Sequence, residues 1–294
     1  MARKVSWERQ QRTDARLLLS GLCLFLAIML GFPTIANLWY SFSDVSFQDL
    51  TGSGFVGIEN YVDALTNPNM WSALLFSLRF AVVATVLQVV FALVLVFVLH
   101  PLVQKRPWLI APLMLPMMVS PALMGMMYRL ILNEFIGPVP VYLDMLGIYV
   151  NFLGIENVYA TLVGIEVLQW TPFAFLVLLT ARQSILPEVE EAAVVDGATG
   201  TKLNFLVILP MLLPTLGIVT FIRFIDAFRV FDHIFVLTGG GPGNQTTSIS
   251  IYIYKLFFKE NELGEAIALS VILLLASLLL LQVGLRAVVR RTEP

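Results

Sequence analysis

The chain has 294 residues, of which 58% are hydrophobic and 13% are charged, and its formal net charge is −2 at pH 7. Soluble domains are about a quarter charged, so this composition indicates a membrane protein, and the net charge gives no reason to expect a nucleic-acid partner. The single cysteine, Cys23, lies in an apolar run, which excludes an intrachain disulfide and a multi-cysteine metal site.

Six apolar segments are long enough to cross about 30 Å of hydrocarbon. In chain order they are 17–40, 76–99, 108–132, 158–181, 204–224 and 264–285. These segments predict an all-α, polytopic membrane protein with six transmembrane helices. The corresponding domains are a basic leader (1–16), a transmembrane domain (17–285) and a tail (286–294). The first segment is too long for the apolar region of a signal peptide, and no small-x-small cleavage site follows it, so we interpret it as an uncleaved anchor.

Basic residues gather on one side of the predicted spans. The leader, the tail and the loops after spans two and four hold 12 of the 18 lysine and arginine residues. They are Arg3, Lys4, Arg9, Arg12, Arg16, Lys105, Arg106, Arg182, Lys202, Arg286, Arg290 and Arg291. The loops 41–71 and 133–157 hold none. Because basic loops stay on the cytoplasmic side, both termini are predicted to be cytoplasmic.

Prolines interrupt the predicted spans at seven positions. They are Pro33, Pro112, Pro116, Pro121, Pro172, Pro210 and Pro214. Several helices are therefore expected to be kinked or broken. Irregular backbone is tolerated at membrane depth where it is buried in protein or lines an aqueous cavity. A translocation path and loose packing of kinked helices both explain this pattern.

Ionisable residues inside spans are functional candidates, because charges in lipid are energetically unfavourable. Those in this chain are Arg79, Arg129, Glu166, Arg223 and Asp226. Arg79 and Arg129 lie near span ends, where we expect their side chains to snorkel toward the interface. Glu166 lies four residues before Trp170, so both share one helical face. A carboxylate beside an aromatic ring suits the hydroxyls and the apolar face of a sugar, but ordinary helix packing explains the pair equally well.

A polar, charged segment, Pro187 to Pro210, separates the fourth and fifth predicted spans. Pro187 suits the first turn of a helix, and Ser184 just upstream is a candidate cap. The predicted helix begins with acidic residues that its positive N-terminus favours: Glu188, Glu190 and Glu191. Gly197 is placed where such a helix ends in a left-handed turn. A helix that docks a protein at the cytoplasmic face and an ordinary solvated loop both fit this pattern.

The run Glu191-Ala192-Ala193, followed by Gly197 and then by Val207-x-Leu209-Pro210, resembles the EAA signature of ABC importer permeases. Asp196 and Ala198 match its sugar-importer version, EAAxxDGA, whereas Val207 replaces the isoleucine that is usual in the family. The resemblance to maltose-type and glycerol-phosphate-type permeases covers nearly the whole chain. It includes "FVGIENYVDAL" (55–65), "LPMMVSPALMGMMYRLILN" (115–133), "WTPF" (170–173) and "FDHIFVLTGGGPGNQTTSISIYIYK" (231–255).

The resemblance implies the type I ABC importer permease fold in a bacterial inner membrane. It also implies that the segment 187–203 holds a coupling helix, which inserts into a cleft on a cytoplasmic ATPase. The implied coupling residues are Glu191, Ala192, Ala193, Asp196 and Gly197. The implied partners are a second homologous permease subunit, a homodimeric ABC ATPase, an extracytoplasmic solute-binding protein and a carbohydrate substrate. The chain itself would then be no enzyme and carry no cofactor, because ATP–Mg binds to the ATPase.

The register of the fifth span against the maltose-type permease runs without gaps from the EAA segment to Pro242. It places the substrate-contacting positions of the family on Arg223, Asp226, Ala227 and Val230. Together with Glu166 and Trp170, these residues form the implied substrate path. The maltose-type permease has small polar and amide groups where this chain has Arg223 and Asp226. A charged or highly hydroxylated ligand and an internal Arg223–Asp226 ion pair are both compatible with this departure.

The glycine-rich stretch "TGGGPGNQTT" (238–247) lacks the lysine and the spacing of a phosphate-binding loop, so we interpret it as a turn on the outer side. His100 and His233 are far apart in the chain, and neither a metal site nor a Ser/Cys–His catalytic set is evident. A secondary transporter or channel is the alternative function, but its repeated halves and mid-membrane ion-coupling residues are not evident either. A membrane scaffold fits the embedded charges less well.

Overall fold

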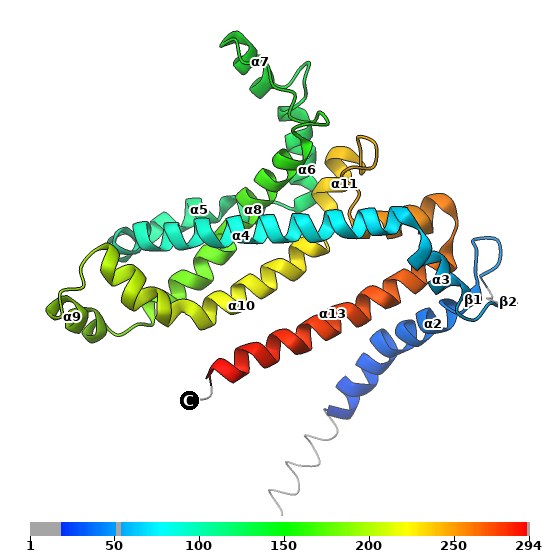
Figure 1. Cartoon of the computed structure of the whole chain (residues 1–294), viewed down its shortest axis with the longest axis horizontal. Helices are drawn as coiled ribbons and strands as arrows, with labels where there is room; N and C mark the ends of the chain where they lie inside the picture. The colour runs from blue at the N-terminus through cyan, green and yellow to red at the C-terminus, as the bar shows by residue number, and fades with distance from the viewer. Residues whose placement is uncertain (1–18, 51–53, 293–294) are drawn as a thin grey trace, which may run out of the picture. The chain divides into compact units, whose positions relative to one another are not determined.

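The computed structural model describes residues 19–50 and 54–292, and these residues are mostly helical (Figure 1). The predicted leader 1–16 and the first two residues of the first predicted span lie outside the described residues. The chain divides into two compact units. One unit comprises the chain up to Asn67 together with Ile253–Leu275, and the other comprises Pro68–Tyr252 together with the chain from Ala276 onward.

The first unit is built from helices and a short hairpin. Its elements are η1 (Ala27–Gly31), α2 (Phe32–Tyr40), β1 (Ser43–Asp44), β2 (Gly54–Phe55), α3 (Glu59–Thr66), η4 (Leu256–Glu260) and the first part of α13 (Leu263–Thr292). The two strands pair antiparallel, with Ser43 opposite Phe55. Asn60 of α3 donates to the carbonyls of Ser41 and Ser43, both at 3.0 Å, and so holds α3 against the hairpin.

The second unit contains the remaining helices. They are α4 (Pro68–Lys105), η2 (Pro107–Leu109), α5 (Ile110–Met118), α6 (Pro121–Ile131), α7 (Pro138–Met145), α8 (Val158–Gln183), α9 (Pro187–Val195), η3 (Leu203–Ile208), α10 (Leu209–Phe228), α11 (Asp232–Thr238) and most of α12 (Ile249–Lys255). The helices α4, α8 and α10 pack on one another, while α6 packs on α11. The segment that contains α7 projects away from α4, α8 and α10 (Figure 1).

The packed face of α4 explains how these helices come close. Buried residues recur along it every three or four positions, and three of the five in the series are alanine: Ala81, Ala84, Gln88, Ala92 and Val96. Small side chains let helix backbones approach in a membrane, where packing rather than the hydrophobic effect drives association. The opposite face of α4 is apolar and exposed. A helix that is apolar on all sides is typical of a membrane span.

The predicted spans and the observed helices agree only in part. Within the described residues, four helical stretches are long and apolar enough to cross a bilayer: Leu19–Tyr40, Pro68–Lys105, Val158–Gln183 and Leu203–Thr238. The predicted third span is two helices, Pro107–Met118 and Pro121–Ile131, bent by 83°. The predicted sixth span falls on α13, whose described apolar stretch, Leu263–Leu279, is shorter than a full span. The count of six therefore stays a prediction.

Prolines lie at several of the irregular points in the backbone. The third predicted span breaks at Val119 and Ser120, whose ψ angles are 132° and 137°. A residue before proline avoids the helical region, so Pro121 forces Ser120 into an extended conformation. The π-helical segments η1 and η3 lie just before Pro33 and Pro210. A proline lacks the N–H and displaces the carbonyl four residues earlier, which widens the preceding turn.

The contact between α6 and α11 depends on Gly125. A Cβ atom at this position would lie 3.0 Å from the carbonyl oxygen and 3.1 Å from the Cα of His233, and 3.1 Å from the Cβ of Val236. Two of these neighbours are backbone atoms, which cannot rotate away. The absence of a side chain at Gly125 therefore lets the two helices approach each other closely.

We expect Gly125→Leu to lower the thermal unfolding temperature of the detergent-purified protein, since overpacking of this kind destabilises by about 1–3 kcal/mol. Gly217→Leu is the matched control, because a Cβ at Gly217 of α10 would meet no atom within 4 Å. Equal unfolding temperatures for the two variants would contradict the close approach.

Candidate functional site

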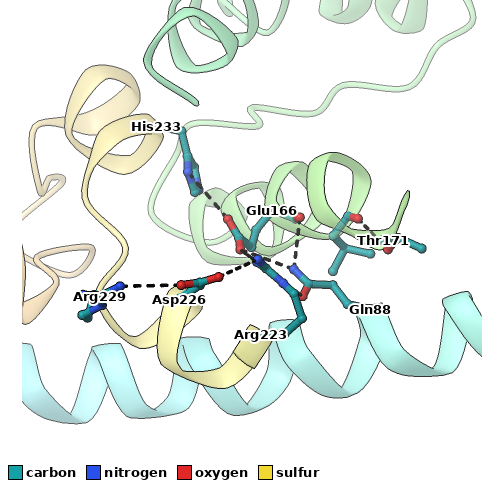
Figure 2. A network of polar contacts seen from close by, with 8 residues as sticks. Gln88, Glu166, Thr171, Arg223, Asp226, Arg229 and His233 are labelled. Atoms are coloured by element: carbon teal, nitrogen blue, oxygen red, sulfur yellow. Dashed lines mark hydrogen bonds and ion pairs between the residues drawn. The ribbon is translucent and has the colours of Figure 1, made fainter. Parts of the chain in front are cut away.

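A single buried guanidinium joins three helices. Arg223 of α10 is 1% exposed. Its Nε donates to Oε1 of Gln88 on α4 at 2.9 Å, and its Nη2 donates to Oε1 of Glu166 on α8 at 2.8 Å (Figure 2). Its Nη1 donates to Oδ2 of Asp226, one turn along α10, at 3.2 Å. A buried charge is tolerated only when it is paired and hydrogen-bonded, and Arg223 meets both conditions.

Trp170 covers one face of this guanidinium. The Cζ of Arg223 lies 4.5 Å from the centre of the indole ring. Cation–π contacts of this kind contribute on the order of 0.5–2 kcal/mol, and more when they are desolvated. Glu166 and Trp170 were predicted to share a face of one helix, and both contact Arg223 from α8.

Gln88 is a member of this network that the sequence analysis did not select. Its side chain is fully buried, and its Nε2 lies 3.2 Å from the backbone oxygen and 3.3 Å from Oε1 of Glu166. It therefore supports both partners of the central ion pair. A glutamine in an otherwise apolar, charge-free run was the available signal. Its partners are 78 and 135 residues away in the chain, so no local pattern identifies them.

His233 of α11 also belongs to this cluster. It is 2% exposed, and its Nδ1 lies 3.8 Å from Oε2 of Glu166 (Figure 2). Its Nε2 has no hydrogen-bond partner among the described residues. The Glu166 carboxylate thus lies between Arg223 on one side and His233 on the other.

Asp226 forms the solvent-facing edge of the network. Its side chain is 45% exposed, and its Oδ1 lies 3.6 Å from Nη2 of Arg229, which is 64% exposed. A cavity of about 230 Å³ opens here between residues of α6, α8, α10 and α11. Its lining includes Glu166, Trp170, Arg223, Asp226, Val230 and His233.

The implied substrate path is therefore assembled in large part. Five of its six residues line this one cavity. The exception is Ala227, which is 0% exposed and lies in the apolar core with Phe80 and Leu162. The predicted internal ion pair of Arg223 and Asp226 is present, with Nη1 of Arg223 3.2 Å from Oδ2 of Asp226. Both residues line the cavity, and the side chain of Asp226 is 45% exposed whereas that of Arg223 is 1% exposed.

The two arginines near the predicted span ends have other contacts. The guanidinium of Arg79 lies over the ring of Tyr159, with its Cζ 4.5 Å from the ring centre. Arg129 donates to the carbonyl of Val236 at 3.3 Å. Both side chains are exposed, and their predicted snorkelling stays a prediction.

The segment after α8 forms the predicted short helix, α9, but with a different N-terminal cap. The cap position is Leu186, without a side-chain hydrogen bond. The prediction that Ser184 caps the N-terminus of α9 is wrong, because Ser184 keeps helical dihedral angles at the end of α8. Its hydroxyl donates back to the carbonyl of Thr180 at 2.9 Å. Pro187 at the start of α9 needs no donor partner, so the helix begins without a polar cap.

The C-terminal end of α9 follows the predicted turn. Gly197 has φ +84° and donates to the carbonyl of Val194 at 3.0 Å, while Ala198 donates to that of Ala193 at 2.8 Å. These two bonds form a Schellman motif, in which a left-handed glycine ends a helix sharply. The implied left-handed stop at Gly197 is confirmed.

The implied coupling residues differ in exposure. Glu191, Ala192, Asp196 and Gly197 are exposed, whereas Ala193 is 8% exposed. Apolar side chains of the same segment are also exposed, at 65% for Leu186, 49% for Val194 and 86% for Val195. An apolar edge beside acidic residues is typical of a protein-docking surface.

No arrangement of metal ligands is found in the described part of the chain, where no three His, Cys, Asp or Glu side chains lie together as a metal ion would require.

No protein-family model matches the chain. It is 32% identical, over 83% of its length and 80% of the relative, to a probable ABC transporter permease protein of Sinorhizobium fredii. It is 31% identical to the trehalose/maltose transport system permease protein MalF of Thermococcus litoralis, over 89% of each chain. The multiple sugar-binding transport system permease protein MsmF of Streptococcus mutans is also 31% identical, over 82% of this chain and 83% of the relative.

Two solved structures share the fold. One is a bacterial ABC transporter involved in the import of the acidic polysaccharide alginate, with a TM-score of 0.80 and 21% identity over 98% of this chain and 99% of that chain. The other is a bacterial alginate ABC transporter in complex with a periplasmic protein bound to an alginate pentasaccharide. Its TM-score is 0.83, with 22% identity over 97% of this chain and 96% of that chain.

We expect Arg223→Ala to destabilise the protein by about 3–5 kcal/mol, because it leaves the buried Glu166 carboxylate unpaired. The double variant Arg223→Met with Glu166→Leu is expected to recover part of this loss, since it removes both charges. Thermal unfolding in detergent measures both effects. Arg229→Ala is the control and is expected to cost at most about 1 kcal/mol, because water screens its exposed pair with Asp226. Equal effects of Arg223→Ala and Arg229→Ala would contradict the anchoring role of Arg223.

Proposed function

The chain belongs to the family of ABC transporter permease proteins, and from this premise we propose that it is the membrane subunit of a binding-protein-dependent carbohydrate importer. The observation that carries the proposal is its identity of 31% to two named sugar permeases over more than four fifths of the chain. A permease of this family is a transport subunit and not an enzyme. Family membership also removes the alternatives of a secondary transporter, a channel and a scaffold.

The helix α9 is proposed to receive force from a homodimeric ATPase subunit, which binds ATP–Mg while this chain holds no cofactor. Three features support this role. The helix exposes Glu191 and Ala192, it ends sharply at Gly197, and it presents the apolar side chains of Val194 and Val195. A rigid helix can transmit a rigid-body movement between two states, whereas a flexible loop cannot.

The chain is proposed to lie in the bacterial inner membrane as a multi-pass protein with cytoplasmic termini. The distribution of lysine and arginine supports this topology. A second permease subunit and an extracytoplasmic binding protein complete the proposed importer. The fold similarity to an alginate transporter that was solved with its periplasmic protein is consistent with such an assembly.

The cavity beside Arg223 is proposed to be part of the substrate path. Trp170 offers an aromatic face, and the half-exposed carboxylate of Asp226 offers an acceptor for hydroxyl groups. This combination fits a carbohydrate. Arg223 has a different role in this proposal, because its side chain is 1% exposed and Nε, Nη1 and Nη2 each donate to a residue of the network: Gln88, Asp226 and Glu166. Its proposed role is to orient the side chains of Glu166 and Asp226, and not to bind the ligand directly.

We expect Glu191→Ala and Gly197→Val each to abolish uptake while membrane insertion stays intact. Glu191 is an exposed coupling residue, and a valine at φ +84° is strained by about 1–2 kcal/mol or more. Uptake by cells and copurification of the ATPase subunit are the measurements. Asp144→Ala, which removes an exposed carboxylate from α7, is the control. Normal uptake and normal ATPase association in both variants would remove the assignment of α9.

Asp226→Asn is expected to lower uptake about tenfold or more, or to change the range of sugars transported, since a hydrogen bond to a charged group contributes about 1.5–3 kcal/mol. The measurement is uptake of a sugar panel by cells that express each variant at equal level. The control is Glu156→Gln, which neutralises an exposed carboxylate in the predicted outer loop. An unchanged rate and an unchanged range would exclude Asp226 from the substrate path.

A further inference from the structure

An ion pair closes the bend between α8 and α9. Arg182 lies in the last turn of α8, and its Nη1 donates to Oε1 of Glu190 on α9. Only the linker 184–186 separates the two helices in the chain. The pair therefore bridges the same junction that the backbone spans.

Burial makes this pair necessary. The Arg182 side chain is 6% exposed, whereas that of Glu190 is 30% exposed. A buried guanidinium is energetically unfavourable unless a partner compensates its charge. The hydrogen bond from Arg182 lowers the pKa of Glu190 below its usual value, so the carboxylate remains ionised at neutral pH. Glu188 in the same first turn is exposed, so it is a suitable control for Glu190.

The ion pair lies beside a cavity and not within a closely packed core. A cavity of about 660 Å³ lies between α9, the ends of α4 and α8, and η3. Its lining includes His100, Gln104, Arg182, Glu190, Glu191 and Asn204. Direct contact between α8 and α9 beside this space includes the ion pair, while Ala193 of α9 is buried and α9 also contacts η3.

The helix α8 connects this junction to the candidate substrate path. Glu166 and Arg182 lie on the same continuous helix, 16 residues apart. At 1.5 Å per residue, this separation is about 24 Å. Along α8, a displacement of α9 reaches Glu166 and Trp170 only if the α8–α9 angle is held during the movement. A junction that flexes would absorb the displacement.

We propose that Arg182 and Glu190 are positioning residues whose ion pair holds α9 at a fixed angle to α8, so that movement of α9 is transmitted to the mid-membrane network. This inference rests on the proposed function, because it assumes that an ATPase subunit moves α9. It concerns Glu190, which precedes the EAA run, and an arginine on the neighbouring helix.

The test uses the transporter purified with the ATPase subunit that assembles with it. Cys23 is replaced by serine, and pairs of spin labels are placed at exposed positions. One pair, at Thr199 directly after α9 and at Leu168, reports the α8–α9 junction, and a second pair, at Leu168 and Val98, reports movement of α8 against α4. Distances are measured by pulsed electron spin resonance before and after addition of ATP, Mg²⁺ and vanadate.

The wild type is expected to shift at both label pairs. Glu190→Gln is expected to broaden the α8–α9 distances and to lose the shift between α8 and α4, while ATPase association is retained. The charge exchange Arg182→Glu with Glu190→Arg is expected to restore the shift. Glu188→Gln, which removes the same charge from the same turn, is expected to behave like the wild type.

A normal α8–α4 shift in Glu190→Gln overturns the inference, and so does a charge exchange that assembles with the ATPase subunit but restores no shift. Glu190 is a partly exposed residue, and its glutamine variant keeps the shape of the side chain, so the result does not depend on Arg182 variants that fail to fold. A wild-type complex that binds no ATPase, or shows no shift with ATP and vanadate, overturns the proposed function instead.

Discussion

The burial of one arginine sets the constraint on which the second unit depends. Arg223 is 1% exposed, and an uncompensated guanidinium at such depth would destabilise the fold by several kcal/mol. Compensation comes from Gln88 on α4 and Glu166 on α8. The three helices must therefore meet at one level along their axes, and each must be rotated so that its residue faces the other two. Apolar packing then continues on both sides of this level, around Phe80 and Leu162 in one cluster and around Phe175 and Leu178 in another. Apolar contacts alone are tolerant of rotation, whereas the hydrogen bonds of a planar guanidinium are not.

Features that follow from local rules could be predicted from the sequence. The fourth predicted span, 158–181, corresponds to α8, and the end of α9 at Gly197 follows from the backbone freedom of glycine. The limits of such rules are equally clear at the third predicted span. Hydropathy is nearly unchanged across Ser120 and Pro121, yet the chain bends there by 83°, because the break arises from backbone sterics that a hydropathy window does not measure.

The remaining differences arise from contacts between distant parts of the chain. Gln88 and His233 join Glu166 from α4 and α11, and nothing within a few residues of either position indicates this partner. Residue type alone also could not decide whether Arg223 reads a ligand or pairs with Asp226, since a spacing of three residues allows both. The structure shows the ion pair between them, with Arg223 1% exposed and Asp226 45% exposed at the edge of the cavity.

The helix α8 combines both ends of the proposed mechanism in one rigid element. It supplies Glu166 to the network in the membrane and Arg182 to the junction with α9. Arginine suits both positions, because its charge persists on burial and its fork of donors fixes direction as well as distance. In one case the arginine belongs to the neighbouring helix and the carboxylate to α8, and in the other the roles are reversed. In the proposed mechanism, the ion pair at each end lets α8 transmit a movement of α9 to Trp170. Pro172 lies inside α8 on this path, where a proline allows a helix to bend instead.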